Sequence, residues 1–335
     1  FSFCFVSCEF PLQPIKSSNR IKGVYIFISK FLFKANQSFA AVKISNLQLH
    51  YLTFFIERFC IFTSNPILMK NLNILLLILF LSSCKVNQLT GKKTFNAFSN
   101  KQLFPMALSQ YEQFLDEHKV VENTKESRQI VSIGERIARA AQKYYEFKGA
   151  PDYLKDYVWE YNLVQDPQRN AWCMPGGKIV FYTGILPVAA NEDGLATIMG
   201  HEVAHALLDH GGQRMTISLA QQGLNIIAIK STENQPEKKR KAILTAYGLG
   251  STVGAVLPFS RKHEKEADQI GLELMAIAGF NPEEAPKLWE RMKAASGGKA
   301  PPEILSTHPS NKRRINDLTK WIPLAKERAQ EINGK

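Results

Sequence analysis

Residues 201–205, His201-Glu202-Val203-Ala204-His205, decide how the rest of the sequence is interpreted. Residues four positions apart lie on one face of an α-helix, so a helix here presents both imidazoles to the same point. Two histidines at this spacing, with a glutamate directly after the first, are typical of a metal-binding helix whose glutamate acts as a general base. The neighbouring residues are mostly apolar, which predicts a buried helix whose few polar side chains serve a site.

Signals for helix ends surround this segment. Asn191 is a favourable N-cap, and Glu192 and Asp193 put negative charge in the first turn. Gly211-Gly212 is typical of a helix end. We therefore expect one helix over residues 192–210.

A third metal ligand must come from another part of the chain. His210 does not fit the motif that supplies a third histidine from the same segment, because that motif needs glycine at position 208 and histidine at 211.

A second helix is predicted over residues 260–279, with an apolar stripe at Ala267, Ile270, Gly271, Leu274 and Ala278. Extending this stripe backwards by three and four residues reaches Glu264, whereas Glu266 and Glu273 fall toward the polar side. Glu264 is therefore the predicted third ligand.

Asp268 lies one turn after Glu264 on the same face and is suited to accept the second ring N–H of His201. Two imidazoles, a carboxylate and an open position for water form the hydrolytic version of the tetrahedral zinc site. The sequence thus predicts one Zn²⁺ per chain, held by His201, His205 and Glu264. His118 and His263 are interpreted as structural, and His210 as a structural or surface residue.

The other elements predict an α+β fold that is mostly helical, with one small antiparallel sheet. Two helical patterns precede the sheet between residues 105 and 145, and helices at 283–296 and 310–333 follow it, the last kinked or split near Pro323. Short aromatic and β-branched runs at 157–164, 171–174 and 178–183 are typical of strands in a meander. The third run precedes the metal-binding helix and is the expected edge for an extended peptide substrate, although it is equally compatible with an ordinary core strand: Lys178, Ile179, Val180, Phe181, Tyr182 and Thr183.

Composition excludes two function classes. The 335 residues are 45% hydrophobic, which is enough for a packed core and excludes a disordered chain. The net charge is +12, but no basic run is interleaved with aromatic residues, so no nucleic-acid partner is expected. After residue 83 only Cys84 and Cys173 remain, and we expect no intramolecular disulfide between them.

The N-terminal residues have the composition of a separate segment. The chain begins at Phe1 and its first methionine is Met69, so we expect residues 1–68 to be a non-native upstream extension of the reading frame. The alternative is a genuine membrane-associated arm, although the apolar runs are interrupted by charges well before the ~20 residues of a membrane span.

Residues 69–83 resemble the signal peptide of a bacterial lipoprotein. Lys70 supplies a positive start, residues 74–81 are apolar without interruption, and the segment ends in Leu81-Ser82-Ser83-Cys84. This pattern predicts lipidation of Cys84, membrane attachment through the lipid anchor, and a polar tether over residues 84–104. The alternative is a signal peptide with a chance cysteine.

Three segments together resemble the gluzincin metallopeptidases, the family that holds HtpX, the CAAX prenyl proteases and the BepA-like and LoiP-like periplasmic lipoprotein peptidases. They are residues 170–177, which include Pro175-Gly176-Gly177, the motif 201–205 and the segment 260–268. The resemblance covers about residues 105–320 and implies a zincin-like metallopeptidase domain over 105–335. It also implies a zinc endopeptidase in which a metal-activated water attacks the peptide bond after Glu202 takes its proton.

The resemblance further implies a role for His308, in Thr307-His308-Pro309. Similar sequences place a histidine close to the metal, where it either occupies the open position or steadies the oxyanion, with Arg314 as a possible neighbour. The expected function is hydrolysis of unfolded or misassembled cell-envelope proteins by a lipid-anchored enzyme that faces the bacterial periplasm. Two alternatives are a chaperone-like envelope lipoprotein with a shut, regulated zinc site, and a membrane-embedded peptidase that uses residues 1–68.

Overall fold

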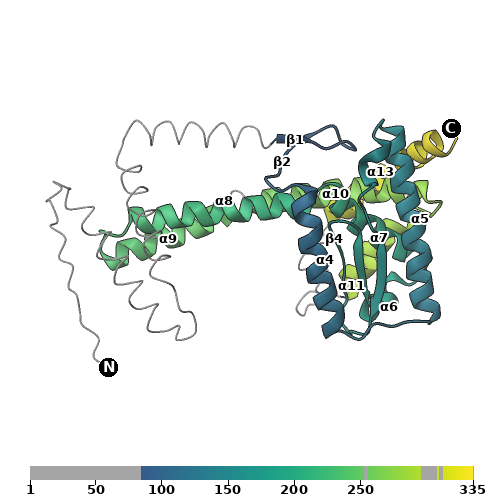
Figure 1. Cartoon of the computed structure of the whole chain (residues 1–335), viewed down its shortest axis with the longest axis horizontal. Helices are drawn as coiled ribbons and strands as arrows, with labels where there is room; N and C mark the ends of the chain where they lie inside the picture. The colour runs from purple at the N-terminus through teal and green to yellow at the C-terminus, as the bar shows by residue number, and fades with distance from the viewer. Residues whose placement is uncertain (1–83, 253–255, 296–307, 309–311, 335) are drawn as a thin grey trace, which may run out of the picture. The chain divides into compact units, whose positions relative to one another are not determined.

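The computed structural model describes residues 84–252, 256–295, 308 and 312–334 (Figure 1). The predicted α+β, mostly helical class is confirmed. The predictions for residues 1–68 and 69–83 lie outside the described residues. In chain order the elements are β1 (Cys84–Val86), β2 (Lys93–Phe95), α4 (Asn100–Glu117), α5 (Lys125–Phe147), β3 (Glu160–Val164), β4 (Ala171–Met174), β5 (Lys178–Tyr182), α6 (Leu186–Ala189), α7 (Glu192–Leu207), α8 (His210–Ser231), α9 (Glu237–Ser251), α10 (Leu257–Ile277), α11 (Glu284–Ala295) and α13 (Lys312–Asn333).

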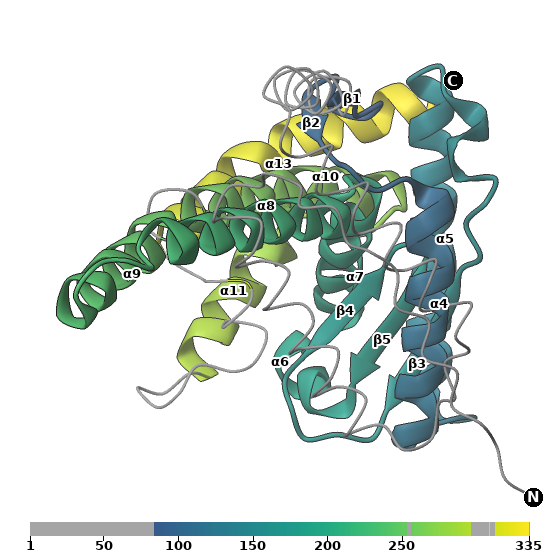
Figure 2. The same cartoon turned by 60° about the vertical axis from the view of Figure 1, so that its left-hand side comes forward.

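Helix α7 is the centre of the packed body. All its residues from Gly194 to Leu207 are buried, and it packs against α5, α6, α10, α11 and β4 (Figure 2). The predicted N-cap is present, because the Asn191 side chain accepts a 2.8 Å hydrogen bond from the backbone N–H of Gly194. Burial on all sides explains the largely apolar composition of this helix.

The predicted C-terminal end of this helix is wrong. Helix α7 ends at Leu207, and α8 begins at His210, so Gly211 and Gly212 lie in the first turn of α8 and do not terminate α7. Asp209 at the break adopts a left-handed backbone with φ of 56°. The Leu207 carbonyl accepts hydrogen bonds at 3.2 Å from the Asn87 side chain and from the Tyr145 hydroxyl, so long-range contacts compensate for the lost helical bond.

Two glycines bring α7 and α10 together next to the metal-binding motif. A β-carbon on Gly200 would lie 2.7 Å from the carbonyl oxygen of Gly271, and one on Gly271 would lie 2.8 Å from the backbone nitrogen of His201. The two backbones therefore meet at a distance that no larger residue permits. This crossing lies directly beside His201 and brings the first turns of α10, which carry Glu264, over the face of α7 that carries the histidines.

The close helix crossing predicts that Gly271→Ala destabilises the protein. Overpacking at this point should lower the free energy of unfolding by about 1–3 kcal/mol, because the helices must move apart. Gly223 in α8 has open space around it, so Gly223→Ala is the matched control and should be neutral or slightly stabilising. Urea unfolding of both variants measures the difference, and equal stabilities would contradict the proposed close packing.

The sheet differs from the predicted antiparallel meander. Its strand order is β3-β5-β4, with β5 parallel to β3 and antiparallel to β4. Strand β5 is therefore central and fully buried, and the predicted substrate edge at residues 178–183 is wrong. Thr183 lies beyond the strand, in a short 3₁₀ turn. Among the described residues, β4 is paired on one side only and is the edge strand that packs against α7.

Residues 84–104 were expected to form a polar tether, but the structure packs them against the body. Strands β1 and β2 pair as an antiparallel hairpin in which Cys84 is opposite Phe95. Leu89 in the connecting turn is only 3% exposed and belongs to the main hydrophobic core. Helix α4 already begins at Asn100. Lipidation at Cys84 stays a prediction.

Two helices were not predicted at all. Helices α8 and α9 form an antiparallel pair, in which the Tyr247 hydroxyl donates to the Gln221 carbonyl at 3.3 Å and the Gln221 amide donates to Ser251 Oγ at 3.1 Å. Both views show this hairpin extending away from α7 and the sheet (Figures 1 and 2). Within the described part of the chain, no helix has both the length and the apolar character needed to cross a bilayer.

Candidate metal centre

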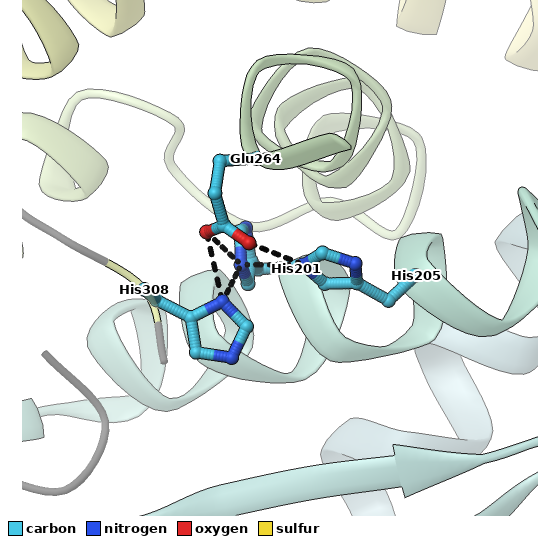
Figure 3. Close-up of side chains that lie close together, drawn as sticks. All are labelled: His201, His205, Glu264 and His308. Atoms are coloured by element: carbon cyan, nitrogen blue, oxygen red, sulfur yellow. Dashed lines mark hydrogen bonds and ion pairs between the residues drawn. The ribbon is translucent and has the colours of Figure 1, made fainter. Parts of the chain in front are cut away.

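Four buried side chains bring their donor atoms to one point (Figure 3). His201 and His205 come from α7, Glu264 comes from α10, and His308 lies between α11 and α13 in the chain. The Nε2 atoms of His201 and His205 are 3.1 Å apart. Glu264 Oε2 lies 3.5 Å from His201 Nε2, and Glu264 Oε1 lies 3.3 Å from His205 Nε2. The structure thus brings the three predicted ligands together.

His308 completes the group. Its Nδ1 atom lies 3.1 Å from His201 Nε2 and 2.8 Å from Glu264 Oε2. It therefore stands where a fourth donor of a tetrahedral site belongs. Of the two sequence-based positions for His308, this geometry matches the occupied fourth position.

The donor set fits a zinc ion. Donors that bind one tetrahedral zinc at about 2.0–2.1 Å are about 3.3–3.4 Å from one another, close to the separations seen here. Two imidazole nitrogens 3.1 Å apart cannot both carry a hydrogen: without metal one N–H donates to the other nitrogen, and once both are deprotonated their lone pairs suit a shared cation. The buried Glu264 carboxylate supplies negative charge, and the nitrogen-rich set favours zinc over magnesium or calcium.

Asp268 and Arg314 lie on the Nδ1 side of His201. Asp268 Oδ1 lies 3.0 Å from His201 Nδ1, which is the predicted pair. Arg314 donates to the same carboxylate oxygen at 2.6 Å and to the His308 carbonyl at 3.1 Å. Its guanidinium carbon lies 3.5 Å from the centre of the Trp289 ring. Arg314 therefore links the supporting carboxylate to the segment that carries His308.

The electrostatics of the metal-free site follow from these contacts. Burial lowers the pKa of His201, but hydrogen bonds to Asp268 and Glu264 outweigh it and raise the pKa to about 9. Burial holds the pKa of His205 well below its usual value. Burial raises the pKa of Glu264, but hydrogen bonds to the three histidines outweigh this effect and lower it. At neutral pH, His201 is therefore protonated, His205 neutral and Glu264 ionised.

Zinc binding should consequently release a proton from His201. The proton leaves Nε2, because the Nδ1 hydrogen remains bonded to Asp268. Since the His201 pKa is about 9, zinc affinity should rise with pH up to that value. We expect about one proton per zinc at about pH 7.5 and almost none at about pH 10.5. Calorimetry in buffers of different ionisation enthalpy measures this number.

The control for proton release is Asp268→Asn, which removes the largest contribution that raises the His201 pKa. This variant should release fewer protons at about pH 7.5, because more of its His201 is already neutral. Equal proton release in both proteins would contradict the assigned pair.

Glu202 lies beside the donor group without joining it. The side chain is buried, and its Oε1 atom makes no hydrogen bond with any described residue. The same oxygen is 3.6 Å from His308 Nε2, which is too long for a hydrogen bond. A buried carboxylate oxygen without a partner is costly, and it suits a group that accepts a proton from a bound molecule.

His210 is a residue whose position the sequence analysis missed. It was interpreted as structural or at the surface, but it is fully buried and its Nδ1 lies 2.9 Å from Nδ1 of His205. Its Nε2 faces Glu266 Oε2 at 3.5 Å, and Glu266 binds Lys92 at 2.8 Å. Five residues from His205 is not a same-face spacing on one helix. Only the break at Asp209 brings the two rings together.

The predictions for the two other glutamates of α10 differ in how well they agree with the structure. Glu266 lies outside the donor group, as expected. Glu273 was expected on the polar side, but it is buried and accepts a hydrogen bond from the Tyr144 hydroxyl. The prediction for Glu273 is wrong because α5 packs over that side of α10, which the sequence of α10 does not show.

Comparison with known proteins identifies relatives over the same part of the chain. The chain is 41% identical over 174 residues to the mitochondrial metalloendopeptidase OMA1 of Schizosaccharomyces pombe, which covers 51% of this chain and 49% of that protein. It is 35% identical over 209 residues to the protein of the same name from Saccharomyces cerevisiae, covering 60% and 57%. It is 28% identical over 160 residues to the beta-barrel assembly-enhancing protease of Escherichia coli, covering 46% and 32%. The chain therefore spans about half the length of the two OMA1 proteins.

These relatives overturn the expected location in a bacterial cell envelope. The OMA1 relatives from fungi, a plant and animals all carry names that place them in mitochondria. The periplasmic location was inferred from the lipoprotein-like signal that ends at Cys84 and from the resemblance to periplasmic lipoprotein peptidases. The expectation of an enzyme that faces the bacterial periplasm is therefore wrong.

A family model describes the whole candidate site. The model for "Peptidase family M48" matches residues 125–322, which is more than half of the chain. This range contains the histidines and glutamates of α7 and α10, His308, and the Asp268–Arg314 pair behind them. The predicted relation to the gluzincin metallopeptidases is thereby confirmed, and the chain belongs to peptidase family M48.

Proposed function

We propose that this chain is a zinc-dependent metalloendopeptidase that cleaves unfolded or misassembled polypeptides. One observation carries the proposal: three zinc-type donors, from His201, His205 and Glu264, meet at one point, and beside them lies the buried Glu202, whose Oε1 atom makes no hydrogen bond with a described residue. A site that only stabilises the fold needs the donors but not a buried base.

The residues of this chain have distinct tasks in the proposed reaction. A bound zinc ion acts as a Lewis acid on the scissile carbonyl and lowers the pKa of water. Glu202 accepts the proton of the attacking water and later donates it to the leaving amine. Asp268 fixes the orientation of His201 through the ring N–H, and His210 holds His205 in the same way.

We propose β4 as the strand on which the substrate lies. Strand β4 (Ala171–Met174) is paired with β5 on one side only, within the described residues, and packs against α7. An extended polypeptide that adds to this edge is bound through its backbone, so recognition depends little on side chains. This mode favours unfolded substrates, which expose their backbone.

The proposal is tested by digestion of an unfolded protein such as casein with the purified 335-residue chain. Cleavage should require zinc, stop with a chelator and return when zinc is restored. Persistent cleavage without metal, or no cleavage of any unfolded substrate by the zinc-loaded protein, would contradict it.

His308 favours a second candidate function, a regulated protein whose zinc site is kept shut. Its Nδ1 already occupies the fourth donor position, so water and substrate have no open position in this arrangement. In an enzyme this state is a resting state, and His308 must move away before cleavage. In a chaperone-like protein it is the permanent state.

The variant His308→Ala distinguishes these states. Zinc should stay bound through the three remaining donors, and basal cleavage should rise about tenfold if the open state is a minor one of about 10%. A fall in turnover of about ten- to a thousandfold with zinc retained would instead assign His308 to oxyanion stabilisation. Cleavage and zinc content are measured on the same preparation, and zinc-loaded protein that remains inactive supports the chaperone-like alternative.

A further inference from the structure

The helical hairpin α8–α9 exposes an unusual amount of apolar surface. Among the described residues, thirteen large apolar side chains are exposed, and six of them lie on these two helices. Ile226 and Ile227 are the most exposed, at 64% and 63%. The six residues are Leu219, Leu224, Ile226, Ile227, Ile229 and Ile243. A concentration of this kind on one protruding element marks a surface that contacts an apolar partner.

Long stretches of the hairpin carry no charged side chain. Residues 215–229 and 242–260 contain no Asp, Glu, Lys or Arg. Gln221 marks the side of α8 that faces α9. Leu219 and Ile226 lie on the opposite side of α8, seven residues apart, which is two helical turns. Between residues 215 and 229, this face of α8 points away from α9 and carries no charged side chain. Such a face is expected to contact an apolar partner rather than water.

The tip of the hairpin is strongly basic. Residues 230–241 contain five basic side chains and only two acidic ones, Glu233 and Glu237. The basic residues are Lys230, Lys238, Lys239, Arg240 and Lys241, and the four lysines are exposed. An apolar face bordered by lysines matches the boundary between the acyl chains and the anionic headgroups of a lipid bilayer. The same positive charge disfavours a second copy of this chain as the partner, since each copy brings an equal positive tip.

We propose that the α8–α9 hairpin docks on the surface of an anionic lipid bilayer. The isoleucines and leucines of the hairpin enter the interface, while the lysines at its tip bind lipid phosphates. Docking does not require a membrane span and does not depend on the peptidase reaction. Because α8 begins three residues after the last residue of α7, docking also keeps the metal centre near the bilayer.

Flotation with vesicles tests the apolar part of this proposal. The 335-residue chain should bind vesicles of phosphatidylcholine mixed with phosphatidylglycerol. The variant Ile226→Ser/Ile227→Ser should bind them about tenfold or more weakly. Val158 is 62% exposed and lies outside the hairpin, so Val158→Ser is the matched control and should bind normally.

The charge requirement is tested with lipid composition and lysine variants. Binding should be weak on phosphatidylcholine alone and should fall in the variant Lys238→Gln/Lys239→Gln/Lys241→Gln. The control for net charge is the variant Lys312→Gln/Arg313→Gln/Lys320→Gln, which neutralises three exposed cations of α13. Equal binding by the two charge variants would overturn the assignment of the tip.

A tryptophan on the hairpin reports docking even if another segment of the chain also binds lipid. Ile227→Trp should gain fluorescence that brominated lipids quench, whereas Val158→Trp should not. Absence of quenching at position 227 would overturn the proposal. Light scattering supplies the other decisive outcome: if Ile226→Ser/Ile227→Ser abolishes self-association and leaves vesicle binding unchanged, the partner is a second copy and the proposal is wrong.

Discussion

Glu202→Gln is expected to lower peptide hydrolysis by about a hundred- to ten-thousandfold while zinc stays bound. The amide has nearly the shape of the carboxylate but cannot accept the proton of the attacking water. Glu202 is not one of the four donors, so its replacement leaves the metal ligands in place. Its Oε1 atom has no hydrogen-bond partner among the described residues, and the substitution therefore breaks no hydrogen bond of that atom.

The measurement compares cleavage rate, zinc content and thermal unfolding of the same protein. Glu290→Gln in α11 makes the same chemical change at an exposed position and should leave all three unchanged. A Glu202→Gln protein that cleaves at the normal rate would remove the general base from the proposed mechanism. Loss of zinc in the same variant would show instead that Glu202 is required for the metal site itself.

The parts of the site that follow from local sequence were predictable. The start of α7 depends on the Asn191 cap, which uses a side chain and a backbone group three residues apart. The orientation of Glu264 and Asp268 depends on the helical period, and both carboxylates lie where the apolar stripe of α10 places them. The donor group itself could be expected because the sequence offers few histidines and inward-facing carboxylates that could bind a metal together with His201 and His205.

The features that depend on contacts between distant segments were not predictable in the same way. The end of α7 at Leu207 depends on Asn87 and Tyr145, which are far away in the sequence. Strand β3 pairs with β5 and not with β4, the next strand along the chain. A meander assumes instead that consecutive strands are neighbours. One signal was available: residues 179–182 are apolar without alternation, which is typical of a strand buried on both faces.

Glu264→Ala should reduce zinc affinity by more than about a hundredfold, since even the loss of a supporting residue outside the ligand set costs about ten- to a hundredfold. His201, His205 and His308 remain in this variant, which lacks one donor oxygen and the negative charge of the donor group. Arg314 lies 3.5 Å from Glu264 Oε2, and without this carboxylate less negative charge offsets the guanidinium next to the metal position.

Glu266→Ala is the matched control for this prediction, because it removes the same side chain two residues further along α10. Glu266 contacts His210 and Lys92 and no donor atom of the site, so its loss affects His205 only through His210. Zinc content after dialysis against a weak chelator should fall in Glu264→Ala and stay near one per chain in Glu266→Ala. If Glu266→Ala empties the site and Glu264→Ala does not, the third ligand has been assigned to the wrong carboxylate, and the face of α10 that carries Glu264 does not hold the metal.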